Sequence, residues 1–215
     1  MIDVAGQINA VRRQVGSRVI EAGQARTVTI TQVYAAPVED VWDACTSPAR
    51  IPRWFLPVSG ELRLGGRYQL EGNAGGTIER CDPPNSFAAT WEFAGETSWI
   101  EVQLTAEPHG RTRLQIEHLA LAGTERWAQF GPGAAGIGWD MILLGLARHL
   151  SAGPSLSPEE GAAWAASGEG RQFMTLSSDR WRDASIAAGT DPADAQASAG
   201  RTLAFYTGGP AAADR

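Results

Sequence analysis

The sequence contains no lysine, and this absence shapes its charge. All 18 basic residues are arginine, against 24 acidic residues, so the formal net charge is −6. Nucleic acids and anionic membrane surfaces attract proteins with clustered positive charge, so neither class of partner is predicted. Together with abundant alanine and glycine, the missing lysine indicates a GC-rich, bacterial coding sequence and says nothing about function.

Cysteine and long apolar runs are also scarce. The two cysteines, Cys45 and Cys81, form neither a metal-ligand spacing nor a disulfide framework, so a reducing cytoplasm is the expected location. No stretch approaches the roughly 18 apolar residues of a membrane span, and residues 1–18 lack the apolar core of a signal peptide. No metal site and no cofactor are predicted. Hydrophobic residues nevertheless make up 43% of the chain, eight tryptophans among them, which is enough for a sizeable core.

Alternating apolar and polar residues dominate the first half of the chain. A strand is predicted from about residue 25, where Val28 and Ile30 share one face, and Pro37 then begins a helix. Turn signals rich in Gly, Pro and Asp separate six further strands, expected at 58–63, 67–71, 76–82, 86–93, 98–107 and 111–120. Because the connections between them are short, the pattern favours an antiparallel meander.

A helix is predicted over about residues 134–150, after a Gly- and Pro-rich entry. Its apolar stripe comprises Trp139, Ile142, Leu143, Leu146 and Leu150. An antiparallel sheet with one wet face must cover its other face, and this helix is the available cover. The predicted fold class is therefore α+β, with a curved antiparallel sheet of about seven strands gripping a long C-terminal helix.

The two ends of the chain are predicted as additions to this domain. The expected division is an N-terminal arm or helix (1–24), the domain itself (25–151) and a helical extension (152–215). In the extension, Ser157-Pro158 and Asp191-Pro192 are helix-start signals, and Phe173, Ser177 and Trp181 form an amphipathic stripe. That stripe either packs back on the domain or forms a dimer interface, and a homodimer is favoured slightly.

Five motifs, in order, resemble those of a known superfamily. They are PVEDVWDACTSPARIPRWF, LRLGGRY, GTIERCDPPNSFAATWEF, GRTRLQIEH and GIGW opening a Leu-rich helix. Together they resemble the SRPBCC or START-like superfamily, and more narrowly the branch related to the C-terminal domain of the activator of the heat-shock protein 90 ATPase. The resemblance runs from about Arg26 to Leu150 and implies a helix-grip fold of the START-like or Bet v-like type.

The resemblance also implies a deep hydrophobic cavity between the sheet and the long helix. Members of the superfamily bind lipids, polyketides and other small hydrophobic molecules, but the branch carries no shared catalytic residues. The side chains expected to contact such a ligand are mostly aromatic. They are Trp42, Trp54, Phe55, Tyr68, Trp91, His118, Trp127, Phe130, Trp139 and Ile142. For each aromatic residue taken singly, an ordinary place in the core is the alternative.

His118 is the ionisable residue that strand alternation places on the apolar face, beside Leu114 and Ile116. It is the candidate general acid or base, or the hydrogen-bond partner of a ligand, and its alternative is a histidine satisfied by a nearby carbonyl. Four acidic residues, Glu79, Glu92, Glu101 and Asp140, lie off the predicted apolar faces and are expected at the surface.

Trp127 and Phe130 are lid candidates, and the glycines from 131 to 138 are a candidate hinge. The alternative for those glycines is close packing at the start of a helix. Three functions remain open from the sequence. The first is non-enzymatic binding of a small hydrophobic ligand, the second a polyketide cyclase or dehydratase that uses His118, and the third regulation of a chaperone ATPase.

Overall fold

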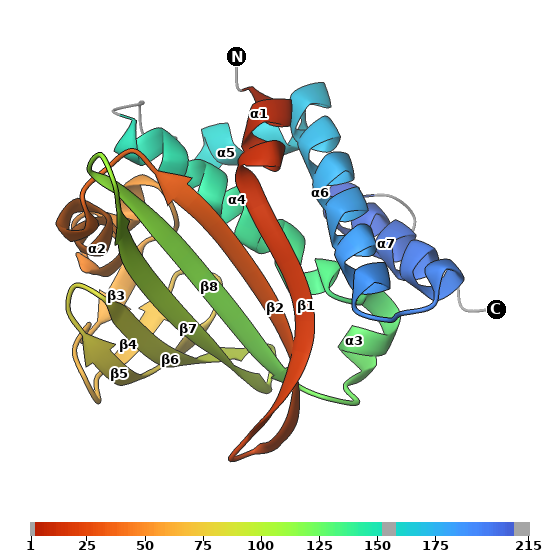
Figure 1. The fold of residues 1–215 in the computed structure, drawn as a ribbon, viewed down its shortest axis with the longest axis horizontal. Coiled ribbons are helices and arrows are strands. Elements are labelled where there is room, and N and C mark those ends of the chain that lie inside the picture. Colours follow the sequence, from red (N-terminus) through yellow and green to blue (C-terminus); the bar gives the residue numbers. More distant parts are fainter. Residues whose placement is uncertain (1–2, 152–157, 209–215) are drawn as a thin grey trace. The chain divides into compact units, whose positions relative to one another are not determined.

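The computed structural model describes residues 3–151 and 158–208 (Figure 1). Its contacts divide the chain into two compact units. We call Met1–Ile30, Leu121–Met141 and Ser157–Arg215 the helical unit, and Thr31–Ala120 with Ile142–Leu156 the sheet unit. These units do not follow the boundaries expected at residues 25 and 152, so the division into one domain with an added segment at each end stays a prediction.

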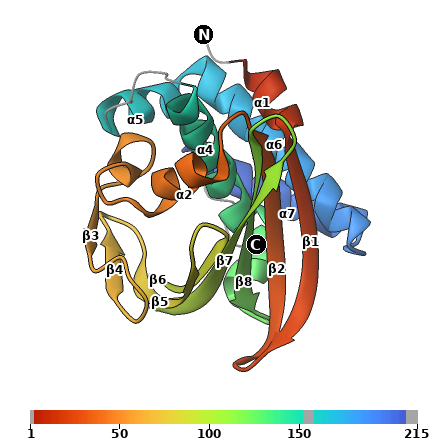
Figure 2. The same ribbon diagram turned by 60° about the vertical axis from the view of Figure 1, so that its left-hand side comes forward.

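Eight strands form one open antiparallel sheet in the order β1-β2-β8-β7-β6-β5-β4-β3 (Figures 1 and 2). Their bounds are β1 Val11–Ile20, β2 Gly23–Tyr34, β3 Val58–Gly60, β4 Arg67–Leu70, β5 Gly75–Asp82, β6 Ser86–Phe93, β7 Glu96–Glu107 and β8 Arg111–Leu121. The six strands predicted after residue 57 are all present, with bounds that differ from the expected ones by three residues or fewer. The meander and the α+β class are confirmed.

The eighth strand is β1, where the sequence indicated a helix or an arm. Only α1 (Val4–Ala10) is helical in that segment, and its N-cap is Asp3. The expectation was wrong for residues 11–20 because Val11, Val15 and Val19 are four residues apart. That spacing places side chains on one face of a helix and equally on one face of a strand.

Strand register in the sheet unit confirms the predicted alternation. His118 lies opposite Ile100, Ile116 opposite Val102, and Val102 opposite Phe87. Residues directly opposite each other in an antiparallel pair project from the same side of the sheet. We call this side the inner face; its members on β6, β7 and β8 include Phe87, Ala89, Trp91, Ser98, Ile100, Val102, Leu104, Leu114, Ile116 and His118. The aliphatic members at its centre are buried.

Helix α2 (Val38–Thr46) starts after Pro37, with two acidic residues in its first turn, as predicted, and packs against β7. A short 3₁₀ turn, η1 (Ile51–Arg53), follows it. Within the sheet unit, the second half of α4 (Gly133–Leu150) meets the residues after η1. A Cβ at Gly145 would lie 2.3 Å from the backbone oxygen of Trp54, so this approach requires glycine.

The remaining helices belong to the helical unit and confirm the pattern of the tail. They are α3 Glu125–Phe130, α5 Pro158–Ala166, α6 Gly168–Ala187 and α7 Pro192–Thr207. Phe173, Ser177 and Trp181 are buried on α6 as expected, and Asp191 caps α7. The expected cap Ser157 lies outside the described residues. Helix α6 packs on α1 and β1, and α7 packs on α3. In the described part of the chain, no helix is both long and apolar enough to cross a membrane.

Candidate functional site

The side chains predicted to contact a ligand are divided between the two units. Seven lie in the sheet unit: Trp42, Trp54, Phe55, Tyr68, Trp91, His118 and Ile142. Trp127, Phe130 and Trp139 lie in the helical unit. The sheet unit therefore holds the larger part of the predicted set, and its inner face is the candidate site.

Aromatic side chains line up along the inner face on β6. Trp42 of α2 meets Phe87 edge to face, with ring centroids 6.1 Å apart and planes at 75°. Four residues further along β6, Trp91 lies beside the ring of His118 at a centroid distance of 6.1 Å. All four rings keep some exposure, unlike the buried aliphatic residues next to them. Phe87 was not among the residues predicted to contact a ligand, although its alternation with Ala89 and Trp91 placed it on this face.

A polar group joins this row where β6, β7 and β8 run side by side. The Ser98 Oγ lies 2.9 Å from Nε2 of His118, and the Ser98 hydroxyl donates to the backbone carbonyl of Trp91 at 3.1 Å. Burial lowers the pKa of His118 to about 4, from an ordinary value of 6.5, so the ring is neutral at pH 7. Ser98 was not among the predicted site residues, although it has the same strand parity as Ile100.

The titration of His118 predicts a stability that depends on pH. In the unfolded chain the imidazole takes up a proton near pH 6.5, whereas in the folded chain it does so only near pH 4. The unfolded state therefore binds the additional proton between these values, and acidification from pH 6.5 to pH 4 lowers the free energy of unfolding. With allowance for the partial exposure of the ring, the loss is on the order of 2 kcal/mol.

Urea unfolding of the wild type and His118→Gln across this pH range measures the effect. The free energy of unfolding of His118→Gln should fall much less between pH 6.5 and pH 4 than that of the wild type. A smaller slope should remain from His149, whose pKa is also lowered by burial, Arg50 and Arg53. His109→Gln removes an exposed histidine, so it is the matched control and should keep the contribution of His118 to the pH dependence. Equal slopes in His118→Gln and the wild type would contradict the assignment.

Other predicted aromatic residues of the sheet unit are fixed by bonds to the backbone. The Trp54 indole donates to the Ala44 carbonyl at 3.0 Å and stacks on Phe55, with ring centroids 5.9 Å apart. The Tyr68 hydroxyl donates to the Thr90 carbonyl at 2.7 Å, and burial raises the pKa of this phenol. These bonds hold α2 to the residues after η1, and β4 to β6.

In the helical unit, the predicted lid and hinge are packed against the tail. Phe130 lies against Phe205 with ring centroids 5.8 Å apart, and its carbonyl accepts from Thr202 at 2.8 Å. Four glycines of the candidate hinge approach tail side chains closely: Gly131 at Ser198, Gly133 at Thr202, Gly136 at Trp181 and Gly138 at Tyr206. The alternative interpretation, close packing at the start of a helix, is confirmed for them.

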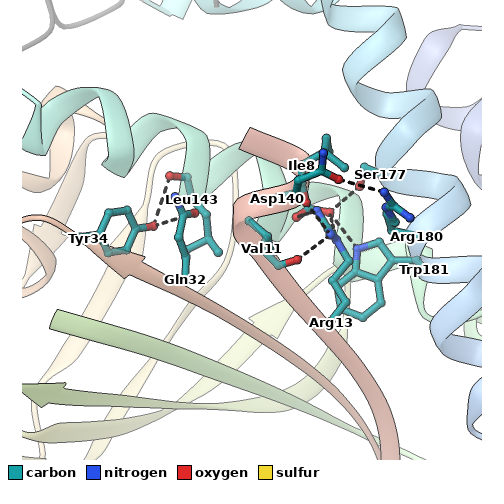
Figure 3. A network of polar contacts seen from close by, with 11 residues as sticks. Ile8, Val11, Arg13, Gln32, Tyr34, Asp140, Leu143, Ser177, Arg180 and Trp181 are labelled. Atoms are coloured by element: carbon teal, nitrogen blue, oxygen red, sulfur yellow. Dashed lines mark hydrogen bonds and ion pairs between the residues drawn. The ribbon is translucent and has the colours of Figure 1, made fainter. Parts of the chain in front are cut away.

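Asp140 is buried, and the expectation of a surface carboxylate was wrong. Its side chain is 1% exposed and pairs with Arg13, whose Nη2 lies 2.7 Å from Oδ1 and whose Nε lies 3.0 Å from Oδ2 (Figure 3). The Ser177 hydroxyl and the Trp181 indole also donate to Oδ2. Arg13 donates further to the carbonyls of Ile8 and Val11. Both oxygens of the Asp140 carboxylate thus accept hydrogen bonds from other side chains of the protein. Asp140 therefore has a structural role and does not face a ligand.

The other acidic candidates and the thiols add little chemistry. Glu79 is exposed as expected, whereas Glu92 and Glu101 are partly buried and pair with Arg67 and Arg80. Burial raises the pKa of the Cys45 thiol to about 12, against a smaller opposing effect of Arg50, so this thiol is unreactive at neutral pH. Within residues 3–151 and 158–208, no three His, Cys, Asp or Glu side chains are grouped to hold a metal ion.

An open antiparallel sheet with a long C-terminal helix defines the helix-grip fold of the START-like, ligand-binding class. The chain belongs to the family of Activator of Hsp90 ATPase homolog 1-like proteins, whose model matches residues 35–151. The resemblance inferred from the sequence motifs is thereby confirmed.

Solved structures extend this similarity. The crystal structure of CalU16 from Micromonospora echinospora is 35% identical, with a TM-score of 0.65, over 84% of this chain and 99% of that one. Its solution structure gives a TM-score of 0.69 over 84% and 97%. Since 84% of the chain exceeds the span of residues 35–151, the similarity to CalU16 reaches into one or both terminal segments.

More distant structures show the fold alone. DynU16, described as a putative protein in the dynemicin biosynthetic locus, is 23% identical over 61% of this chain and 49% of its own, with a TM-score of 0.53. An HSP90 activator from Plasmodium falciparum, PFC0360w, is 20% identical over 60% and 97%, with a TM-score of 0.51. No curated protein matches the chain.

Proposed function

We propose that the sheet unit binds a small hydrophobic ligand against its inner face, between the Trp42–Phe87 pair and the Trp91–His118 pair. The observation that carries the proposal is that these rings stay partly exposed while the aliphatic side chains beside them are buried. Phe87 and Trp91 are four residues apart on one strand, roughly 13 Å at the usual rise. That span suits one or two fused aromatic rings or a short alkyl chain.

The expected affinity follows from the apolar area that such a ligand would bury. Removing about 200 Å² of apolar surface from water contributes about 5 kcal/mol. Ordering the ligand opposes this gain, so a simple aromatic probe should bind no more tightly than about 0.2 mM, that is, in the millimolar range. A polar group at one end of the row, here His118 with Ser98, would fix the orientation of the ligand.

Calorimetric titration with 4-propylphenol tests the proposal, because the probe has one apolar ring and one polar end. Trp91→Ala should weaken its binding by about tenfold or more, because it removes the largest ring beside His118. Trp99 is the matched control, since it is a half-buried tryptophan on the adjacent strand that projects from the opposite face. Trp99→Ala should change the affinity by less than about twofold. Equal losses in the two variants, both checked for folding by circular dichroism, would contradict the site.

Native mass spectrometry of the purified protein complements the titration. It should show a bound apolar molecule that is absent or reduced in Trp91→Ala, and it reports the oligomeric state in the same measurement. The homodimer remains a proposal that this measurement tests. The cyclase or dehydratase activity and the regulation of a chaperone ATPase stay predictions of the sequence.

A further inference from the structure

Arg50 joins helix α2 to the C-terminal end of helix α4 within the sheet unit. Its Nη1 donates to the Asp40 carboxylate at 2.7 Å, to the Asp40 carbonyl at 3.2 Å and to the Asp43 carboxylate at 3.0 Å. Its Nε and Nη2 both lie 3.2 Å from Nε2 of His149, which is in the last turn of α4. We call Arg50 with Asp40, Asp43 and His149 the Arg50 clamp.

The chemistry of the guanidinium decides the protonation of His149 in the Arg50 clamp. An arginine stays charged and carries only donors, so Nε2 of His149 must accept. A neutral imidazole has one protonated nitrogen, which places its proton on Nδ1. In the imidazolium, Nε2 also carries a proton, and two cationic donors would face each other at 3.2 Å. The Arg50 clamp is therefore closed only while His149 is neutral.

The charged groups around His149 couple its protonation to the state of the Arg50 clamp. Burial, Arg50 and Arg53 of η1 lower the pKa of His149 below its ordinary value of 6.5, and Asp40 of α2 opposes them. Arg148 is the neighbouring cation on α4 itself. Opening would relieve the burial and separate the two cations, so the open form takes up a proton more readily than the closed form. Acidification below pH 6.5 therefore favours the open form.

The Arg50 clamp acts on the proposed site through Trp42, whose ring meets Phe87 on the inner face and whose backbone belongs to α2. A second contact between α2 and α4 involves no titrating group. There the Trp54 indole donates to the Ala44 carbonyl, and the Trp54 backbone approaches Gly145 of α4. Loss of the Arg50 clamp leaves this second contact intact. The first half of α2 is then less firmly held, and the Trp42 ring with it.

We propose that the Arg50 clamp regulates the proposed site by pH: with His149 neutral it holds α2 and the Trp42 ring in place for a ligand, and protonation of His149 opens it and weakens binding. This inference rests on the proposed function and adds its regulation. His118 cannot supply the same response, because its ring takes up a proton only near pH 4 in the folded chain. A change between pH 7.5 and pH 5.5 is therefore expected to come from His149.

NMR titration with 4-propylphenol at pH 7.5 and pH 5.5 tests this regulation. The wild type should bind about threefold more weakly at pH 5.5, a small coupling because the Arg50 clamp is partly exposed. In His149→Gln, a neutral amide oxygen can accept from Arg50 at both pH values, so the affinity should not change. Arg50→Met should bind at pH 7.5 as weakly as the acidified wild type, with no further loss at pH 5.5. His109→Gln, which removes an exposed histidine, should keep the wild-type response.

Nitrogen-15 NMR tests the Arg50 clamp without a ligand. At pH 7.5 the His149 imidazole should show the Nδ1–H tautomer, and its signal is the one absent from His149→Gln. The backbone amides of α2 should shift with the same midpoint as the ring, below pH 6.5, and this shift should disappear in His149→Gln. An Nε2–H tautomer, or α2 amides that do not follow the ring, would overturn the Arg50 clamp.

The two experiments separate failure of the regulation from failure of the site. Equal binding of 4-propylphenol by the folded wild type at both pH values overturns the regulation alone. A pH response that persists in His149→Gln belongs to another group and overturns it as well. Absence of binding at both pH values overturns the proposed function and its regulation together, while the tautomer and the α2 amides still decide whether the Arg50 clamp exists.

Discussion

Asp140→Asn is expected to lower the free energy of unfolding by about 3–5 kcal/mol, the range for breaking a buried ion pair by removing one charge. Donors from Arg13, Ser177 and Trp181 all point at the carboxylate, and its side chain is 1% exposed. An asparagine would offer one acceptor oxygen and place an amide N–H against another donor. The Arg13 guanidinium, itself 4% exposed, would stay buried without its counter-charge.

Urea unfolding of Asp140→Asn against a surface control measures this loss. Asp183 pairs with Arg182 on the same unit, but the two side chains are 53% and 25% exposed. Asp183→Asn should therefore cost less than about 1 kcal/mol, as exposed ion pairs do. A double-mutant cycle with Arg13→Met should give a favourable coupling energy between Arg13 and Asp140. Equal losses in Asp140→Asn and Asp183→Asn would refute the assigned role of the network.

The network explains why the two ends of the chain form one unit. Arg13 comes from β1, Asp140 from α4, and Ser177 and Trp181 from α6 (Figure 3). A buried charge is costly unless it is paired and hydrogen-bonded, so none of these segments can lose its partners cheaply. The N-terminal strand and the tail helices are thus held to the same point on α4, and the helical unit is expected to unfold as a whole.

The sequence predicted most of the sheet unit because its signals are local. Turn residues bounded the strands from β3 to β8, and alternation placed His118 on the same face as Ile116. Its position opposite Ile100 depends on strand register, which alternation does not give. The same alternation contained Phe87 and Ser98, so these two members of the site could have been found. The direction of the Ser98 hydroxyl could not, because it depends on how the Trp91 carbonyl lies across the register.

The helical unit was harder to predict because its contacts join distant segments. Arg13 and Asp140 are 127 residues apart. One local signal was present, since Asp140 is the single acidic residue of helix Gly133–Leu150 and its neighbours are apolar up to the basic last turn. A helix that is apolar on every side is usually buried, and an acid within it then needs a partner. The sequence could not show which arginine supplies it.

Gly136→Ala is the second change with a large expected effect, and its sign is set by competition between two terms. Alanine is favoured over glycine inside a helix by about 1 kcal/mol, which alone would stabilise α4. A Cβ at this position, however, would lie 2.3 Å from Cε2 and 2.5 Å from Nε1 of Trp181. The indole cannot move aside easily, because it is 1% exposed and its Nε1 donates to Asp140.

Moving the indole would therefore stretch the Trp181–Asp140 bond and disturb the Arg13 pair as well. Overpacking of a filled core and weakening of a buried hydrogen bond together should outweigh the higher helix propensity of alanine. The free energy of unfolding should therefore fall by about 2–4 kcal/mol. Gly200→Ala in α7 is the matched control, since a Cβ there meets no atom within 4 Å. It should stabilise by about 0.5–1 kcal/mol. Thermal and urea unfolding of both variants should thus shift in opposite directions, and a stabilised Gly136→Ala would show that the tail does not press on α4 at this point.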